Sequence, residues 1–333
     1  MLSWTLESGL GRAMDDAKVN EANLTRLPRG ASVIDAVLDS DLLHSFLGSK
    51  LTIAAALVVM GITLAAVLAP VIAPHDPYDL RSLNLLDSQQ PPVWLKDGEW
   101  RYLLGTDDQG RDVLSSILYG SRLSLGVGVL SVAFAAALGV GLGLCAGYAG
   151  GALDALIMRI ADVQLTFPAI LIALLIEGSA QALFGVHREQ TLILGGLVLS
   201  IGLSFWVQYA RMVRGLTLVE KSKDYVLAAR LIGIHPALIL FRHVLPNVMG
   251  PVLVIATINL ALAIITEATL SFLGVGLPPT QPSLGTLIRI GNNFLFAGEW
   301  WITIFPGVTL AALVVAINLL GDWLRDALDP RLR

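Results

Sequence analysis

Long apolar runs alternate with polar stretches along most of this chain. The first run, residues 51–73, would reach about 34 Å as a helix, which is enough to cross a hydrocarbon core of about 30 Å. Five further runs have the same character, so we predict six transmembrane helices. The later ones are expected within residues 124–150, 152–177, 191–209, 252–272 and 300–320. Pro168 is expected to kink the third span, because proline interrupts helical hydrogen bonding.

The composition agrees with an integral membrane protein. Charged residues make up 14% of the chain and hydrophobic residues 55%, with a mean hydropathy of +0.72. Soluble domains carry about 25% charged residues. The net charge of -4 adds little, because the charges are confined to loops. The single cysteine, Cys145, excludes an intrachain disulfide. The polar start of the chain contains no cleavable signal peptide, so the first span is expected to act as an uncleaved anchor.

Charge asymmetry orients the spans. Six basic residues surround the polar stretch between the fourth and fifth spans, against one, Arg188 or Arg289, in each neighbouring loop. Because basic loops stay in the cytoplasm, we predict that this stretch and both termini are cytoplasmic. The predicted organisation is a cytoplasmic tail (1–50), a first transmembrane helix (51–73), a periplasmic loop (74–123) and a core of five helices (124–333) with a cytoplasmic loop (211–247). The six basic residues are Arg211, Arg214, Lys221, Lys223, Arg230 and Arg242.

A helical hairpin is predicted within this loop, at residues 224–247. Tyr225, Ala228, Ala229 and Ile232 follow helical spacing and would share one face, on which the two alanines leave a shallow surface for a partner. Gly233 would let the chain turn where a side chain would clash.

Proline residues shape the second half of the hairpin. Pro236 suits the first turn of a second helix, and Pro246 is expected to bend the exit. A hairpin at the inner face of the membrane is typical of a docking element for a soluble partner.

Small and aromatic residues predict how the spans pack. Gly139, Gly143 and Gly147 recur every four residues, a pattern that lets another helix approach closely. Trp206 and Tyr209 are expected to be interfacial anchors at the end of the fourth span.

Signatures of catalysis are absent from the sequence. No Gly-Lys dipeptide occurs, so there is no Walker A loop, and no HExxH or paired-cysteine metal spacing is found. We therefore predict a protein that is not an enzyme and carries no cofactor or metal. Asp107, Asp108 and Asp112 allow a calcium site to be considered, but their spacing matches no familiar loop. Gly105 and Gly110 permit turns there, Thr106 or Asp107 would cap backbone amides, and Asp112 would favour the start of the helix that follows.

The hairpin resembles the EAA motif of bacterial ABC importer permeases. Leu-Ala-Ala at 227–229, Gly233 and His-Val-Leu-Pro at 243–246 carry the resemblance. Leu227 stands where Glu is typical and His243 where Ile is typical, as in the peptide-importer branch. In this family the loop supplies a coupling helix that docks on the ATPase subunit. The residues that the resemblance assigns to ATPase coupling are Tyr225, Ala228, Ala229, Gly233, Leu245 and Pro246.

Two other segments resemble the same branch. LGTDDQGRDVLSSIL at 104–118 and SFLGVGLPPTQPSLG at 271–285 are similar to segments of C-type permeases of the dipeptide, oligopeptide and nickel group. The resemblance implies an all-α type I ABC importer permease fold in the bacterial inner membrane. Its implied partners are a second homologous permease, two ATP-binding subunits, an extracytoplasmic binding protein and membrane lipid, with no nucleic acid. It implies alternating-access import of peptides or similar solutes, with ATP bound by the partner subunits, and it leaves the substrate open.

Alternatives remain at this point. An ion-gradient-driven secondary transporter is the main rival, although such proteins tend to have internal repeats and ionisable residues in mid-membrane. A scaffold without a transport role is a third possibility. Glu267, in the fifth span, either lines the translocation path or forms a structural hydrogen bond with a neighbouring helix.

Overall fold

The computed structural model describes residues 41–79, 83–185, 190–281 and 283–328. Two compact units, residues 1–49 and residues 50–333, divide the chain. The described part of the first unit ends with helix α3, Asp41–Gly48. The prediction of a cytoplasmic tail therefore falls mostly outside the described residues, and the features below belong to the second unit.

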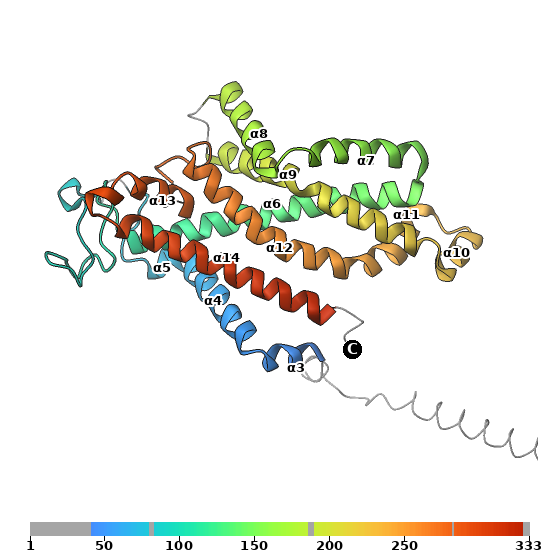
Figure 1. Ribbon diagram of the computed structural model, residues 1–333, viewed down its shortest axis with the longest axis horizontal. Helices are drawn as coiled ribbons and strands as arrows, with labels where there is room; N and C mark the ends of the chain where they lie inside the picture. Colours follow the sequence, from blue (N-terminus) through green and yellow to red (C-terminus); the bar gives the residue numbers. More distant parts are fainter. Residues whose placement is uncertain (1–40, 80–82, 186–189, 282, 329–333) are drawn as a thin grey trace, which may run out of the picture. The chain divides into compact units, whose positions relative to one another are not determined.

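The second unit is helical, with long helices joined by short ones (Figure 1). Its helices are α4 (Lys50–Val67), α5 (Ala69–Ile72), α6 (Val113–Ala149), α7 (Gly151–Leu165), α8 (Ala169–Phe184), α9 (Gln190–Glu220), α10 (Asp224–Leu231), α11 (Pro236–Ile239), α12 (Leu245–Phe272), α13 (Leu284–Asn292) and α14 (Trp301–Leu328). Short 3₁₀ turns lie at Leu85–Asp87 and Leu295–Ala297, and a π-helical turn, Leu240–Val244, joins α11 to α12.

Five of the six predicted spans are found as single helical stretches. Among the described residues, five helical stretches are long and apolar enough to cross a membrane: α4, α6, α9, the stretch from Pro236 to Phe272, and α14. The pair α7 and α8, bent by 93°, forms a sixth span if it is taken as one. Pro168 precedes α8 at this bend, which confirms the predicted kink.

Several helices extend well beyond the predicted spans. Helix α6 begins at Val113 and contains 37 residues, so it is about 55 Å long and exceeds a hydrocarbon core of about 30 Å. Helix α14 likewise continues to Leu328. Hydropathy locates the apolar part of a helix, and the caps decide where the helix itself ends.

Glycines bring α6 and α9 into close contact. A Cβ added at Gly139 would lie 2.4 Å from the Trp206 carbonyl oxygen, and one added at Gly143 would lie 2.6 Å from the Ala210 carbonyl oxygen. At Gly147 it would lie 2.7 Å from the Thr217 Cβ. The predicted close packing at these glycines is confirmed.

The predicted anchors on α9 are buried instead. Trp206 is 6% exposed and Tyr209 is fully buried. The Trp206 indole Nε1 donates a hydrogen bond to Gln164 Oε1 of α7 at 2.8 Å. The interfacial prediction is therefore wrong, because α9 continues to Glu220 and these rings lie within the helix, facing its neighbours.

The segment before α6 folds into a tight structure. Gly105 and Gly110 have φ of 82° and 76°, as the turn prediction requires. Asp107 Oδ1 accepts hydrogen bonds from the backbone amides of Gln109 and Arg111, each at 2.9 Å. These contacts confirm that an acidic side chain caps backbone amides here.

Acidic residues in this segment have structural partners. Asp107 Oδ2 lies 2.6 Å from Arg111 Nε in a buried ion pair, and Arg111 Nη1 donates to the Pro279 carbonyl oxygen at 2.7 Å. Asp112 caps α6 by accepting from the Ser115 amide at 2.8 Å. No group of three or more potential metal-binding residues exists among the described residues, so the calcium alternative has no support there.

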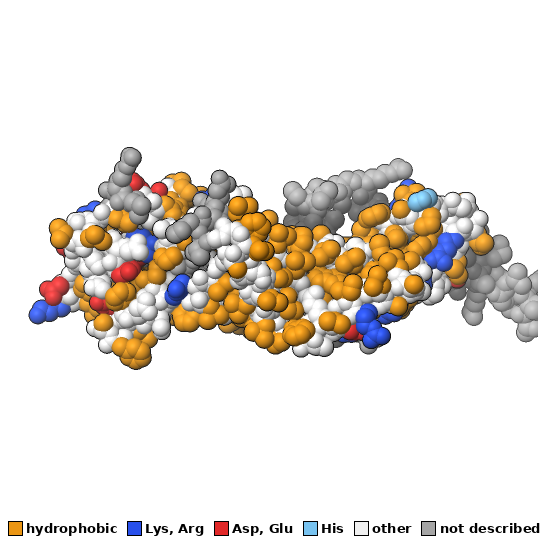
Figure 2. All heavy atoms as spheres, turned by 90° about the horizontal axis from the view of Figure 1, so that it is seen from above, with side chains coloured by type: hydrophobic (Ala, Val, Ile, Leu, Met, Phe, Trp, Pro, Cys, Tyr) orange, Lys and Arg blue, Asp and Glu red, His pale blue; other side chains and the backbone are white. Residues whose placement is uncertain are grey.

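Apolar side chains cover the middle of the face seen in Figure 2, while charged side chains gather toward its two ends. One end carries the loop before α6 together with α13, and the other carries α10 (Figure 1). We call them the loop end and the hairpin end. The main buried cluster lies along α6, α9 and α12 and continues into the hairpin through Val226, Ala229 and Ile239. The main core thus reaches into the hairpin end, while the loop end has a separate buried cluster that includes Val113, Leu284 and Trp301.

Candidate functional site

The hairpin at residues 224–247 forms a compact helix, turn and helix. Helix α10 ends at Leu231, and the turn that follows is closed by two backbone hydrogen bonds, from Gly233 N to Arg230 O at 3.0 Å and from Ile234 N to Ala229 O at 3.1 Å. This pair of bonds is a Schellman motif. Pro236 occupies the first turn of α11, as predicted.

Gly233 is required for its backbone conformation. Its φ is +82°, a region that residues with a side chain adopt at a cost of about 1–2 kcal/mol. A Cβ built there has no heavy atom within 4 Å. The prediction of a turn at Gly233 is confirmed, but the predicted clash is wrong, because the constraint is the left-handed φ.

The two faces of α10 differ from the prediction. Val226 is fully buried and Ala229 is 5% exposed, both in the core cluster. Leu231 is 89% exposed and Ile232 is 79% exposed. Helical spacing alone placed Ala228 and Ala229 on one docking face; the packing turns Ala229 inward and leaves Ala228 outside. The exposed surface consists of Leu227, Ala228, Leu231 and Ile232, which we call the apolar knob.

Tyr225 ties the hairpin to the helices on either side. Its hydroxyl donates to the Glu220 carboxylate at the end of α9 and accepts from Asn247 Nδ2 of α12 at 3.0 Å. Asn247 Nδ2 also donates to the His243 carbonyl oxygen at 2.7 Å, and Lys223 Nζ lies 2.7 Å from Glu220 Oε2. Burial, followed by the hydrogen bond to Glu220, raises the pKa of Tyr225 to about 12. The phenol therefore stays protonated and able to donate.

Helix α6 supplies a further attachment. The Arg230 guanidinium lies 4.6 Å from the centre of the Tyr148 ring, within the range of a cation–π contact. Lys221 Nζ donates to the Gly147 carbonyl oxygen at 2.6 Å. The hairpin is thus fixed to α6, α9 and α12 at once.

The exit from the hairpin is a continuous helical stretch. Leu245 is half-buried and packs against the core cluster, while Pro246 is exposed in the first turn of α12. The chain from Pro236 to Phe272 forms one helical stretch through the π-helical turn. The helix therefore continues past Pro246 without a break, because the π-helical turn directly before it changes the hydrogen-bond register at the proline, which has no N–H to donate.

Glu267 lies far from the hairpin, near the loop end of α12. It is fully buried, and its carboxylate accepts hydrogen bonds from Ser124 Oγ of α6 at 2.7 Å and from Ser271 Oγ at 2.8 Å. Ser124 Oγ also accepts from the Leu284 amide of α13 at 3.4 Å. This network joins three helices, and it supports the structural alternative over a place on the translocation path.

Family comparisons fit this arrangement. Residues 139–333 match the family model described as the inner membrane component of binding-protein-dependent transport systems, and residues 40–92 match the N-terminal transmembrane domain of oligopeptide transport permease C. The chain belongs to this transport family. It is an inner-membrane transport component, and the comparisons lend no support to the ion-gradient-driven alternative.

Relatives cover most of the chain. The dipeptide transport system permease protein DppC of Haemophilus influenzae is 38% identical over 83% of this chain and 88% of its own length. The di/tripeptide transport system permease protein DppC of Pseudomonas aeruginosa is 39% identical over 87% of this chain and 91% of its own.

A solved structure supports the fold. A chain of the MetNI methionine ABC transporter, in an inward-facing conformation, aligns with a TM-score of 0.50 and 20% identity over 64% of this chain and 96% of that chain. The type I ABC importer permease fold expected from the sequence is confirmed.

The segment that matches the permease family includes the whole hairpin. The residues that attach the hairpin to α6, α9 and α12 were not predicted from the sequence. Glu220, Asn247 and Tyr148 have no motif of their own, and Tyr148 is far from Arg230 in the chain. The exposed Leu227, Leu231 and Ile232 could have been found as an apolar run on a polar loop.

Proposed function

We propose that this chain is one of two related permease subunits of an ATP-driven importer of short peptides. Two cytoplasmic subunits bind and hydrolyse ATP, and an extracytoplasmic binding protein delivers the peptide. The names of the relatives, which are dipeptide and di/tripeptide permeases, support the substrate class. The observation that carries the proposal is an exposed apolar knob on a hairpin that is fixed to three helices.

The apolar knob suits a groove on an ATP-binding subunit. Leu231 and Ile232 have apolar side chains, yet both are largely exposed. Full burial of each such side chain would contribute about 1.5–3 kcal/mol. A few anchors of this kind commonly dominate an interface.

Movement of the knob is passed to the spans through its attachments. Tyr225 connects it to α9 and α12, and Arg230 connects it to α6. A push by the ATP-binding subunits therefore acts on three helices together, which is what alternating access by rigid-body movement needs. In this mechanism Gly233 matters for the shape of the hairpin and has no chemical role.

A double substitution in the apolar knob tests the proposal. We expect Leu231→Ser with Ile232→Ser to remove most of the ATP-binding subunits from the purified complex and to reduce ATP-dependent peptide uptake, because the docking surface loses its apolar contacts. The matched control is Leu86→Ser, an equally apolar side chain that is 86% exposed at the loop end. Normal copurification and uptake in the double variant would show that the knob is not the coupling surface.

The orientation of the spans follows from the same proposal. The hairpin end and both termini are cytoplasmic, as the basic residues indicate. In a Cys145→Ser background, a cysteine at exposed Ser222 is expected to react with an impermeant maleimide only after the membrane is opened. A cysteine at Leu86 is expected to react in intact spheroplasts, and the reverse pattern would invert the topology.

A further inference from the structure

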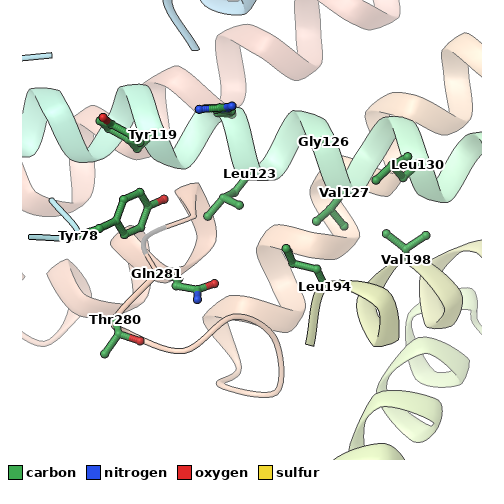
Figure 3. Close-up of a pocket in the computed structure, with 11 residues that line it drawn as sticks. Tyr78, Tyr119, Leu123, Gly126, Val127, Leu130, Leu194, Val198, Thr280 and Gln281 are labelled. Carbon is green, nitrogen blue, oxygen red and sulfur yellow. The ribbon is translucent and has the colours of Figure 1, made fainter. Parts of the chain in front are cut away.

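A cavity of about 770 Å³ lies between α6, α9 and the loop that follows α12, toward the loop end. Its size is within the range of about 300–1,000 Å³ that small-molecule sites occupy. Figure 3 shows the side chains of Tyr78, Leu123, Leu194 and Gln281 directed into the same space. None of the residues named above for the coupling hairpin lines this cavity.

One face of α6 forms a wall of the cavity. Tyr119, Arg122, Leu123, Gly126, Val127 and Leu130 all line it, and their spacing of three and four residues places them on one side of the helix. Gly126 leaves room in the middle of this wall, because a Cβ built there has no heavy atom within 4 Å.

The cavity has a cationic group at the edge of the membrane span. Arg122 is exposed, and the stretch of α6 from Leu123 to its end contains no charged residue. Arg122 therefore lies where the apolar part of α6 begins. A guanidinium in such a place binds a carboxylate through paired, charge-assisted hydrogen bonds.

Neutral polar groups lie beside the cation. The rings of Tyr78 and Tyr119 pack edge to face with their centres 5.2 Å apart. Burial, followed by the nearby Asp76 carboxylate, raises the pKa of Tyr78 to about 12, so its hydroxyl is a neutral donor. The Gln281 amide oxygen is buried and has no hydrogen-bond partner among the described residues. This oxygen is therefore available to accept a hydrogen bond from an N–H group of a ligand.

Apolar side chains complete the cavity. Leu123, Val127 and Leu130 of α6 face Leu194 and Val198 of α9 across it (Figure 3). The three kinds of group match the three parts of a short peptide: a carboxylate, N–H groups and apolar side chains.

We propose that this cavity is a peptide-binding site within the permease, in which Arg122 binds the terminal carboxylate and Gln281 accepts a hydrogen bond from a peptide N–H. The apolar wall receives a side chain of the peptide. This inference rests on the proposed function, since it assigns the place where the imported peptide is held during its passage.

Uptake by the complete importer in proteoliposomes tests this assignment. The assay follows ATP-dependent uptake of radiolabelled alanylphenylalanine with saturating binding protein. We expect R122Q to reduce uptake by about tenfold or more, the effect of losing one charge-assisted contact, while R122K, which keeps the charge, loses about threefold or less. The purified R122Q complex is expected to contain all its subunits.

Filling the cavity provides a second variant with a matched control. G126L places a side chain into the space opposite α9 and is expected to reduce uptake about as strongly as R122Q. G61L is the control, because Gly61 on α4 also has no heavy atom within 4 Å of a built Cβ and lies outside the cavity.

Each outcome decides between the alternatives. Wild-type uptake by R122Q and G126L overturns the site while the importer function stands. Loss of the second permease from both variant complexes shows that a neighbouring subunit fills the cavity, which also overturns the site. Absence of ATP-dependent uptake in the wild-type complex overturns the proposed function and, with it, the site.

Discussion

Replacement of Gly143 by alanine is expected to weaken the contact between α6 and α9. The added Cβ would lie 2.6 Å from the Ala210 carbonyl oxygen and 2.9 Å from the Val213 Cβ. The Ala210 carbonyl oxygen is part of the backbone of α9, and the Val213 Cβ is fixed directly to that backbone. Neither atom can rotate away from the added methyl group. Reaching the 3.4 Å at which ordinary contact begins requires a displacement of about 0.8 Å at Ala210.

The cost can be estimated from this overlap. Overpacking of a well-packed contact costs about 1–3 kcal/mol. Gly141 provides a matched control on the same helix, because a Cβ there meets no heavy atom within 4 Å. Gly→Ala in a helix interior otherwise stabilises by about 0.5–1 kcal/mol. Because that gain applies to both variants and cancels, G143A is expected to be less stable than G141A by the overpacking cost alone, about 1–3 kcal/mol.

Thermal inactivation of the detergent-purified complex measures this difference. Samples are heated, and the fraction that remains monodisperse gives an apparent Tm, which is suitable because membrane complexes unfold irreversibly. At about 2 °C per kcal/mol, G143A should lie about 2–6 °C below G141A. Equal apparent Tm values for the two variants would refute the reasoning that the glycines bring the helices together.

Three further predictions concern the hairpin, the loop before α6 and pH. Gly233→Val should abolish peptide uptake while membrane insertion stays normal, because φ of +82° is unfavourable for a β-branched residue; Gly233→Asn should retain much of the uptake, and equal losses would contradict the conformational argument. Arg111→Met should lower stability by about 3–5 kcal/mol, seen as a lower apparent Tm, because it leaves the buried Asp107 carboxylate unpaired. Adding Asp107→Asn should restore part of the lost stability, and no recovery would rule out the ion pair as the cause. The pKa of Tyr225 is raised from 10.0 to about 12, so the stability that its protonated hydroxyl contributes is present below pH 10 and is lost as the pH rises toward 12. Tyr225→Phe should show a smaller fall in apparent Tm over that interval, and an unchanged fall would contradict the raised pKa.

Local signals explain what could be predicted. The apolar spans, the turn at Gly233, the amide cap at Asp107 and the close-packing glycines of α6 each depend on residues within a few turns of one another. Apolar length, glycine φ and capping side chains act at that range. The sequence was sufficient for these features because their causes are local.

Features that depend on a distant partner were mispredicted or missed. Ala229 and Ala228 have the same side chain, and only the packing of Val226 and Ala229 into the core decides which alanine is outside. Trp206 has the composition of an interfacial anchor but lies against α7 because α9 is longer than its apolar run.

The sequence by itself determined a membrane protein of six apolar spans, the helix, turn and helix of the hairpin, and the family resemblance. Hydrophobic length, turn residues and motif spacing act along the chain, so they are readable from it. The tertiary structure alone decided that Glu267 is held by Ser124 and that Arg230 meets Tyr148. It also decided that α6 and α9 enclose a cavity. Those contacts join residues far apart in the chain, and their formation depends on how whole helices pack.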